Sequence, residues 1–270
     1  MKKELKSITA DLAAYVKQLD EDTTSHRSQD TGHRLQDISH MAQETDKKTP
    51  AEKIRDAGRE ARDTVVRPTG DAMAALAKEI RACRKCRLGN SRLNAVVGVG
   101  NTSAKVVFVG EGPGFQEDHK GEPFVGRSGQ LLDKILDTVL GLKREDVYIA
   151  NIVKCHPMKD PESPESHGND RPPDPEEISA CRPYLDRQLV LIKPKCIVTL
   201  GSVATKVLLG VTQGISLMRG KWHDYPVDLF GPGHPIKVLP TYHPAALLRN
   251  SNLKRETWED MKMLKAFLDE

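Results

Sequence analysis

A glycine-rich turn in the middle of the chain carries the residue types expected of a site that binds a flat polar ring. The apolar run 107–109 predicts a buried strand, and the three glycines that follow it let the backbone turn sharply and approach a ligand closely. Glu111 lies inside the turn, and Glu117 and Asp118 follow it. Phe124 comes just before a predicted helix start. Together these features predict such a site.

Four of the five cysteines have the spacing of a metal site. Cys83 and Cys86 are separated by two residues, so both thiolates can reach one metal. Cys155 follows a predicted strand and Cys181 lies in a predicted helix. From spacing alone, a metal is favoured over cysteines buried as small hydrophobes, with zinc ahead of an iron–sulfur cluster. Cys196 begins an apolar run and is assigned to the core.

The segments that must position these residues alternate between strand and helix patterns. The predicted strands are 105–109, 147–153, 196–200 and 237–240. The predicted helices are 72–82, 131–140, 176–192, 203–209 and 258–268. Strands that alternate with helices form a parallel sheet between helical layers. The sequence therefore predicts an α/β fold: a three-layer α/β/α sandwich with a central, mostly parallel four-stranded sheet.

Polar residues fall at or just beyond the carboxyl ends of these four strands. They are Glu111, Asn151, Ser202 and His243. In open parallel sheets this edge forms the ligand crevice, so the four residues are expected to define one site. The segment 158–175, rich in Pro, Ser, Asp and Glu, is predicted to be a loop.

The N-terminal part of the chain differs from the rest in composition. Residues 20–70 carry few large apolar side chains and many charged ones, which predicts a flexible polar linker. Before it, residues 3–20 have apolar positions at helical spacing and predict a short amphipathic helix, frayed or docked on a protein partner. The chain is therefore divided into an N-terminal extension, 1–68, and a folded domain, 69–270.

The charge and the N-terminus limit the class of protein. A formal net charge of +3 permits nucleic-acid binding without arguing for it, because a binding groove needs local positive charge. Glu4 and Lys6 interrupt any apolar core of a secretion signal, and no apolar run is long enough to span a bilayer. We expect a cytoplasmic, monomeric protein with no membrane contact.

In this order, the motifs resemble those of the family 4 uracil-DNA glycosylases, the iron–sulfur branch of the uracil-DNA glycosylase superfamily. The resemblance runs from about Met73 to the C-terminus and rests on the cysteine pair, the glycine turn, the segment 151–155, Cys181 and the segment 242–249. It implies a monofunctional enzyme that removes uracil from DNA and leaves an abasic site, in base excision repair of deaminated cytosine. It also implies a 4Fe–4S cluster held by Cys83, Cys86, Cys155 and Cys181.

The resemblance also implies how the base is held. Phe124 corresponds to the residue that stacks on uracil, and the backbone amide of Gly112 is expected to bond the base. Asn151 corresponds to the residue that reads the base edge, because its carbonyl can accept from N3–H while its amide donates to O4. Glu117 corresponds to a side chain that crowds C5, where thymine carries its methyl group.

Two residues are expected to act in catalysis and two on the duplex. His243 corresponds to the donor that stabilises negative charge on uracil O2 as the glycosidic bond breaks. Glu111 is expected to orient water or to stabilise the sugar cation, with hydrogen bonds to turn amides as the alternative. Leu248 is expected to fill the gap left by the extruded base, and Arg249 to meet phosphates.

A different class of function stays open on the sequence alone. The chain could be a catalytically silent iron–sulfur or zinc DNA-binding module that recruits partners through its N-terminal extension. Glu111, Phe124, Asn151 and His243 occur together, which argues against that alternative. The basic insertion that marks a covalent uracil-trapping branch is absent after Gly126, so that branch is disfavoured as well.

Overall fold

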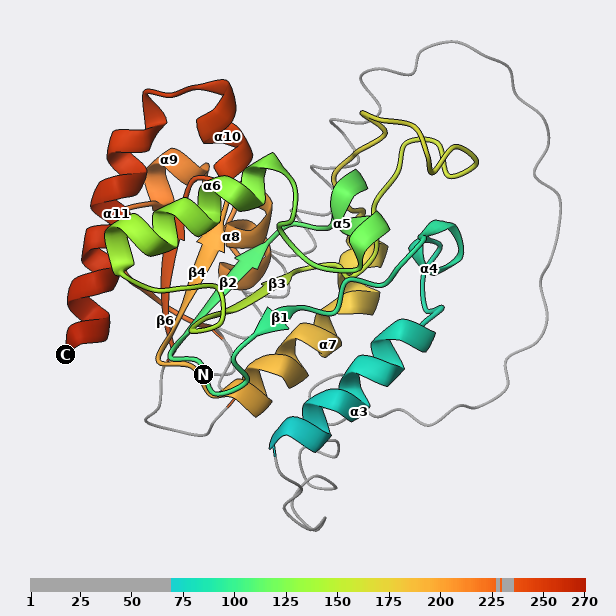
Figure 1. Cartoon of the computed structure of the whole chain (residues 1–270), viewed down its shortest axis with the longest axis horizontal. Helices are drawn as coiled ribbons and strands as arrows, with labels where there is room; N and C mark the ends of the chain where they lie inside the picture. The colour runs from blue at the N-terminus through green and yellow to red at the C-terminus, as the bar shows by residue number, and fades with distance from the viewer. Residues whose placement is uncertain (1–68, 227–228, 230–235) are drawn as a thin grey trace, which may run out of the picture.

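The computed structural model describes residues 69–226, 229 and 236–270, and shows a central sheet between two helical layers (Figure 1). The sheet has six strands in the order β1-β3-β2-β4-β6-β5. The strands are β1 Val99–Gly100, β2 Val106–Gly110, β3 Tyr148–Asn151, β4 Cys196–Leu200, β5 His223–Asp224 and β6 Lys237–Thr241. The four central strands run parallel, and the two edge strands pair antiparallel.

The predicted sandwich and its mostly parallel sheet are confirmed, but the sheet is wider than the four strands expected. The additional strands β1 and β5 have two residues each, too short to leave a periodic pattern in the sequence. The predicted strand 147–153 is also shorter, because β3 ends at Asn151. This end leaves the Asn151 side chain at the carboxyl edge of the sheet.

The helices of the described residues are α3 Thr69–Ala82, α4 Leu88–Ser91, α5 Phe115–Lys120, α6 Arg127–Ile135, α7 Pro175–Ile192, α8 Ser202–Leu209, α9 Ile215–Met218, α10 Pro244–Arg249 and α11 Leu253–Asp269. A π-helical turn, Leu136–Leu140, continues α6, so the predicted helix 131–140 is two elements. The segment 158–175 is a loop up to the start of α7, as predicted, with one isolated bridge between Met158 and Asp170.

Successive side chains of a strand point to opposite faces of the sheet, so the hydrophobic core has two parts, one on each face. Val107 and Val109 of β2 pack with α3, α7 and α8, whereas Val106 and Phe108 pack with α6, the π turn and α11. Figure 1 shows α3 and α7 side by side on one side of the sheet, and α6, α10 and α11 together on the other. Because both faces are covered, the strands read as continuous apolar runs. Cys196 is buried in the second core, as predicted.

Within the described residues, none of the helices has the length and hydropathy needed to cross a bilayer. The predictions for the extension 1–68, its short helix, its linker and its protein partner, lie outside the described residues.

Candidate active site and four-cysteine cavity

A cavity of about 930 Å³ opens at the carboxyl edge of the parallel strands. The four residues expected to meet there all line it: Glu111, Asn151, Ser202 and His243. The strand-end argument therefore brought together residues that are up to 132 positions apart in the sequence (243 − 111). Phe124, Gly112, Glu117 and Arg249 line the same cavity.

Phe124 forms an aromatic wall of this cavity in a constrained backbone conformation. Its ring centroid lies 5.4 Å from that of His243, with the two rings tilted by 33°. Its φ of 53° is in the left-handed region, which non-glycine residues seldom occupy. The surroundings hold this conformation, because Arg144 donates from its guanidinium to the carbonyls of Pro123 and Phe124 at 2.6–2.9 Å.

Gly110 is required by the way Phe124 and Asn151 pack over the end of β2. A Cβ atom at Gly110 would lie 2.4 Å from Asn151 Oδ1 and 2.6 Å from the Phe124 ring. Neither contact is possible without displacing a cavity-lining side chain. The glycine that ends the strand thus allows an amide and an aromatic ring to share one wall.

Asn151 offers an unused acceptor inside the protein. The residue is 2% exposed, and its Oδ1 atom has no hydrogen-bond partner among the described residues. Buried polar atoms are almost always paired, because an unpaired one costs roughly 1–3 kcal/mol. An unpaired acceptor at the wall of a cavity is suited to a ligand that brings its own N–H donor.

His243 is a neutral imidazole with its donor free. Burial, reinforced by the positive charge of Arg249, lowers the pKa of His243 to about 4. Its Nδ1 atom accepts a hydrogen bond from the backbone N–H of Ala245 at 3.1 Å, where His243 caps α10. The single proton of the neutral ring is therefore on Nε2. The side chain can donate one hydrogen bond into the cavity without bringing a charge.

Glu111 and Glu117 have different surroundings although both line the cavity. Burial raises the pKa of Glu111, and its carboxylate has no hydrogen-bond partner in the described part of the chain. The turn amides that were the alternative role for Glu111 are instead bound by Glu117. Its Oε2 accepts from Gly114 N–H at 3.2 Å, and its Oε1 accepts from the N–H groups of Val125 and Gly126 at 3.0 and 3.1 Å.

This pattern gives Glu117 a positioning role that the sequence did not reveal. Its two oxygens fasten the start of α5 to the loop that carries Phe124. Two of its three donors directly follow Phe124, so the carboxylate supports the strained aromatic wall. The role at C5 that the resemblance implies for Glu117 stays a prediction.

Leu248 and Arg249 lie at the end of α10, beside the cavity. Leu248 is 43% exposed, although it is a large apolar residue, and Arg249 lines the cavity. An exposed leucine next to a cationic side chain is suited to a partner with both apolar and anionic surface. The roles on the duplex that the resemblance implies for Leu248 and Arg249 stay predictions.

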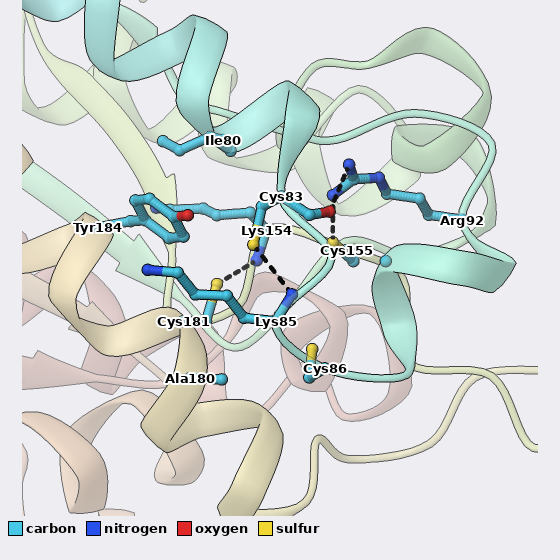
Figure 2. A pocket seen from close by; sticks show the side chains of 11 residues that line it. Ile80, Cys83, Lys85, Cys86, Arg92, Lys154, Cys155, Ala180, Cys181 and Tyr184 are labelled. Carbon is cyan, nitrogen blue, oxygen red and sulfur yellow. Dashed lines mark hydrogen bonds between the residues drawn. The ribbon is translucent and has the colours of Figure 1, made fainter.

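The four cysteines expected to hold a metal line one small cavity between α3, α7 and the end of β3 (Figure 2). Cys155 and Cys181 are buried, and Cys83 and Cys86 are half-buried. Burial raises the pKa of the Cys155 thiol to about 12 and raises that of Cys181. These thiols need a bound cation before they can ionise. The donor set is thus all sulfur.

Three N–H donors face the sulfur atoms of this cavity. Arg92 donates from Nη1 to Cys155 Sγ at 2.9 Å, and the backbone N–H of Lys154 donates to Cys181 Sγ at 3.2 Å. The backbone N–H of Lys85 lies 3.5 Å from Cys83 Sγ. Among the described residues, no three His, Cys, Asp or Glu side chains lie close enough together to hold a single metal ion.

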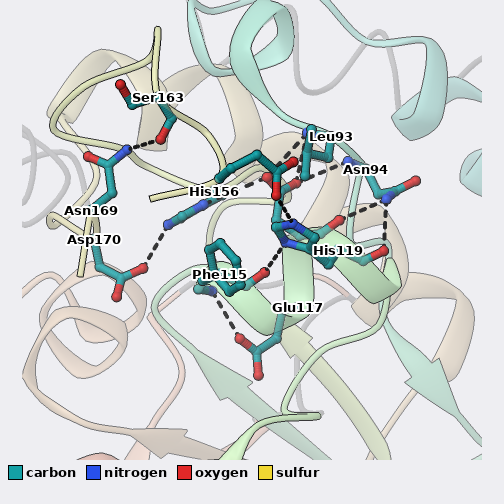
Figure 3. Close-up of polar contacts among 12 residues, drawn as sticks. Leu93, Asn94, Phe115, Glu117, His119, His156, Ser163, Asn169 and Asp170 are labelled. Atoms are coloured by element: carbon teal, nitrogen blue, oxygen red, sulfur yellow. Dashed lines mark hydrogen bonds and ion pairs between the residues drawn. The ribbon is translucent and has the colours of Figure 1, made fainter. Parts of the chain in front are cut away.

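A buried ionic network fastens the loop 158–174 beside the active-site turn (Figure 3). His156 is fully buried between two carboxylates, with Nε2 2.7 Å from Asp170 Oδ1 and Nδ1 3.7 Å from Asp118 Oδ2. Burial alone would lower the pKa of His156, but the two carboxylates outweigh it and raise the pKa to about 9. Asp118 also accepts from the backbone N–H groups of Leu93 and Asn94. Asp118 therefore joins the segment 93–94 and His156 to helix α5 behind the site.

The same loop is attached to α5 by side chains that the sequence did not single out. The Phe115 ring lies 4.1 Å, centroid to centroid, from both His119 and His167. His119 Nε2 pairs with Glu165 Oε2 at 2.9 Å. Asp170 also lines the active-site cavity. Only the spacing of His and Asp residues in an otherwise polar loop hinted at these contacts, and such spacing is common in loops.

Comparison with known proteins shows the family to which this chain belongs. The model of the uracil DNA glycosylase superfamily matches residues 97–262. A type-4 uracil-DNA glycosylase of Saccharolobus solfataricus is 42% identical over 202 residues, which cover 73% of this chain and 87% of that protein. A type-4 uracil-DNA glycosylase of Archaeoglobus fulgidus is 43% identical over 70% of this chain and 89% of that protein. The one of Thermotoga maritima is 41% identical over 73% of this chain and 95% of that protein. The chain belongs to the uracil-DNA glycosylase superfamily and, within it, to the type-4 uracil-DNA glycosylases.

Proposed function

We propose that this protein is a monofunctional uracil-DNA glycosylase, which hydrolyses the N-glycosidic bond of uracil in DNA and leaves an abasic site. The observation that carries the proposal is the unpaired, buried Oδ1 atom of Asn151 in a cavity that also holds an aromatic wall and a neutral imidazole. A base in a duplex is out of reach, so the nucleotide must be extruded into this cavity. The reaction belongs to base excision repair of deaminated cytosine.

Three groups hold the extruded base. Phe124 stacks on its face, and the Gly112 amide donates to its edge. Asn151 Oδ1 accepts from N3–H while the amide nitrogen donates to O4. Cytosine presents the opposite pattern at these two atoms, so it would leave both groups unpaired. The specificity for uracil thus follows from the Asn151 side chain, whose Oδ1 acceptor is unpaired until the base donates to it.

His243 and Glu111 act on the bond itself. As the bond from the sugar to N1 breaks, negative charge collects on uracil O2, and His243 Nε2–H donates to it. One such oriented donor contributes roughly 3 kcal/mol to the transition state. Glu111 orients the attacking water or stabilises the positive charge on the sugar; burial raises the pKa of its carboxyl group, and only its backbone carbonyl, which accepts from Val153 N–H, is bonded within the described residues.

Leu248 and Arg249 act on the DNA. The exposed leucine occupies the gap that the extruded base leaves, and the guanidinium meets a phosphate. No lysine in these motifs is placed as a Schiff-base nucleophile, so strand cleavage is not part of the reaction. We expect a monomer that acts in the cytoplasm, with uracil-containing DNA as its partner.

Cys83, Cys86, Cys155 and Cys181 hold a 4Fe–4S cluster in this proposal. The donor set supports a cluster, since the four cysteine sulfurs line one cavity and thiolates are the usual ligands of iron–sulfur clusters. A bound cluster would cross-link the segment that follows α3, helix α7 and the segment that follows β3. Hydrolysis needs no electron transfer, and the cysteine cavity is separate from the active-site cavity.

A labelled oligonucleotide that contains one uracil tests the function. After incubation, alkali should cut the strand at the uracil position, and the strand should stay intact without alkali. A matching oligonucleotide with thymine at that position is the control. Tight DNA binding with no alkali-sensitive product would contradict the proposal and favour the silent DNA-binding module.

The metal is tested separately by colour and composition. Anaerobically purified protein should be brown, with iron and sulfide in a 4:4 ratio per chain by the cluster assignment. Cys83→Ser and Cys181→Ser should lose the colour, whereas Cys196→Ala, which changes a cysteine of the core, should keep it. Stoichiometric zinc in colourless protein would refute the cluster.

A further inference from the structure

Lys154 is a buried lysine that the reaction described above does not use. It is 1% exposed and lies between the four-cysteine cavity and the end of strand β3 (Figure 2). Lysine is almost never fully buried unless it is paired, because removing an ammonium from water is very costly. The contacts of this side chain must therefore account for its position.

Lys154 makes one set of hydrogen bonds with its side chain and another with its backbone. Its Nζ atom donates to the backbone carbonyl of Asn151 at 2.9 Å and to Gln188 Oε1 at 2.7 Å. Its own backbone N–H donates to Cys181 Sγ at 3.2 Å. One residue therefore touches both the residue that reads the base and a cysteine of the metal site.

The far end of the Lys154 side chain has a fixed anchor. Gln188 of α7 donates from Nε2 to the Val97 carbonyl at 2.8 Å and to the Tyr148 hydroxyl at 3.0 Å. These bonds leave Gln188 Oε1 directed at the ammonium, and Gln188 is itself fully buried. The Lys154 ammonium is therefore held in one place and fixes the main-chain position of Asn151.

We propose that Lys154 is a positioning residue, which fixes Asn151 for base reading and ties it to the cysteine site through Cys181. This inference rests on the proposed uracil excision. If the backbone of Asn151 shifts, the amide no longer meets N3 and O4 together. The Lys154 side chain also lines the same cavity as the four cysteines, so its positive charge lies close to the metal site. Lys154 thus contacts both sites, Asn151 through its side chain and Cys181 through its backbone.

A double-mutant cycle tests the action on Asn151. Lys154→Met keeps the length of the side chain and removes its donors. It should slow single-turnover excision about tenfold or more. Asn151→Ala should be slower still, and adding Lys154→Met to it should change the rate less than about twofold, because Lys154 acts through Asn151. Independent, multiplying effects would overturn the proposal.

Lys262→Met is the matched control, since Lys262 is exposed on α11 and, among the residues that the structure describes, pairs only with Glu259. It should leave the rate unchanged. If Lys154→Met does not retain iron, Gln188→Leu takes its place, because it releases the ammonium from its anchor and keeps the charge. Gln188→Leu should slow excision with the same non-additivity toward Asn151→Ala. A wild-type rate in this variant would overturn the proposal.

The reduction potential of the iron-loaded protein is a second readout that does not depend on glycosylase activity. Lys154→Met should shift it to more negative values, because a positive charge beside the sulfurs is lost, while Lys262→Met should not. Protein that excises no uracil but shows this shift would refute the proposed function alone. An unchanged potential in Lys154→Met would refute the link between Lys154 and the metal site.

Discussion

At the scale of single residues, the protonation state of His243 decides whether this side chain brings a positive charge into the active-site cavity or only a neutral hydrogen-bond donor. With a pKa near 4 and Nδ1 occupied by the Ala245 amide, the ring is neutral at physiological pH and its proton is on Nε2. A neutral donor gains most when negative charge appears on the base, so it favours the transition state over bound substrate.

Replacement of His243 by Ala should therefore slow single-turnover excision by about two orders of magnitude, the loss expected for one oriented donor. DNA affinity, measured by fluorescence anisotropy, should change little, because phosphate contacts dominate it. His223→Ala is the control, because within the described part of the chain the ring of this β5 residue bonds only the Met218 carbonyl at the end of α9. A near-normal rate in His243→Ala would exclude His243 as the donor.

The second residue-scale prediction concerns the side chain of Asn151. Asn151→Asp replaces an amide that both donates and accepts by a carboxylate that only accepts, or donates once if protonated. Uracil O4 then loses its donor, and uracil excision should become far slower. Cytosine offers an amino group at that position, so weak excision of unpaired or mispaired cytosine should appear.

Cytosine in a sound G·C pair should resist this variant, because extrusion is most costly there. Oligonucleotides with cytosine unpaired, mispaired or paired with guanine separate these cases. Full uracil activity in Asn151→Asp would mean that another residue reads the base.

At the scale of elements, the end of strand β2 is the tightest point of the site. A methyl group at Gly110 would collide with the Phe124 ring and with Asn151 Oδ1. Gly110→Ala should therefore reduce excision at least about a hundredfold, because both the stacking wall and the base reader must move. Gly70→Ala, where a Cβ meets nothing within 4 Å, should leave the rate unchanged. A wild-type rate in Gly110→Ala would show that the wall is more adaptable than its packing indicates.

Elements also show what the sequence could predict and what it could not. The four central strands and the long helices have several apolar residues in a regular pattern, so they were predictable, and with them the meeting of Glu111, Asn151 and His243. Strands β1 and β5 and the four- to six-residue helices contain too few residues to show a period. Hydrogen bonds such as those of Glu117 and Lys154 depend on tertiary contact, so spacing alone does not reveal them.

At the scale of the whole molecule, every residue assigned to either site lies beyond position 68. A protein that lacks residues 1–68 should therefore bind iron and excise uracil from short oligonucleotides within about threefold of the full chain. Single-turnover assays at equal iron content compare the two proteins. A large loss of rate with the metal retained would assign the extension to the catalytic unit.

Because the two hydrophobic cores lie on opposite faces of the sheet, the helices of one face can unfold locally while those of the other face stay folded. All four cysteines border the core that contains α3 and α7, while the π turn and α11 pack only in the other. Removing the metal should then raise amide hydrogen exchange in α3 and in the segment 83–95 and leave α11 protected, a sub-global opening rather than global unfolding. Exchange measured by mass spectrometry on iron-loaded and iron-depleted protein would detect it. Equal loss of protection in α11 would instead mean that the sheet transmits the disturbance, so that iron starvation would disable DNA binding through α10 as well.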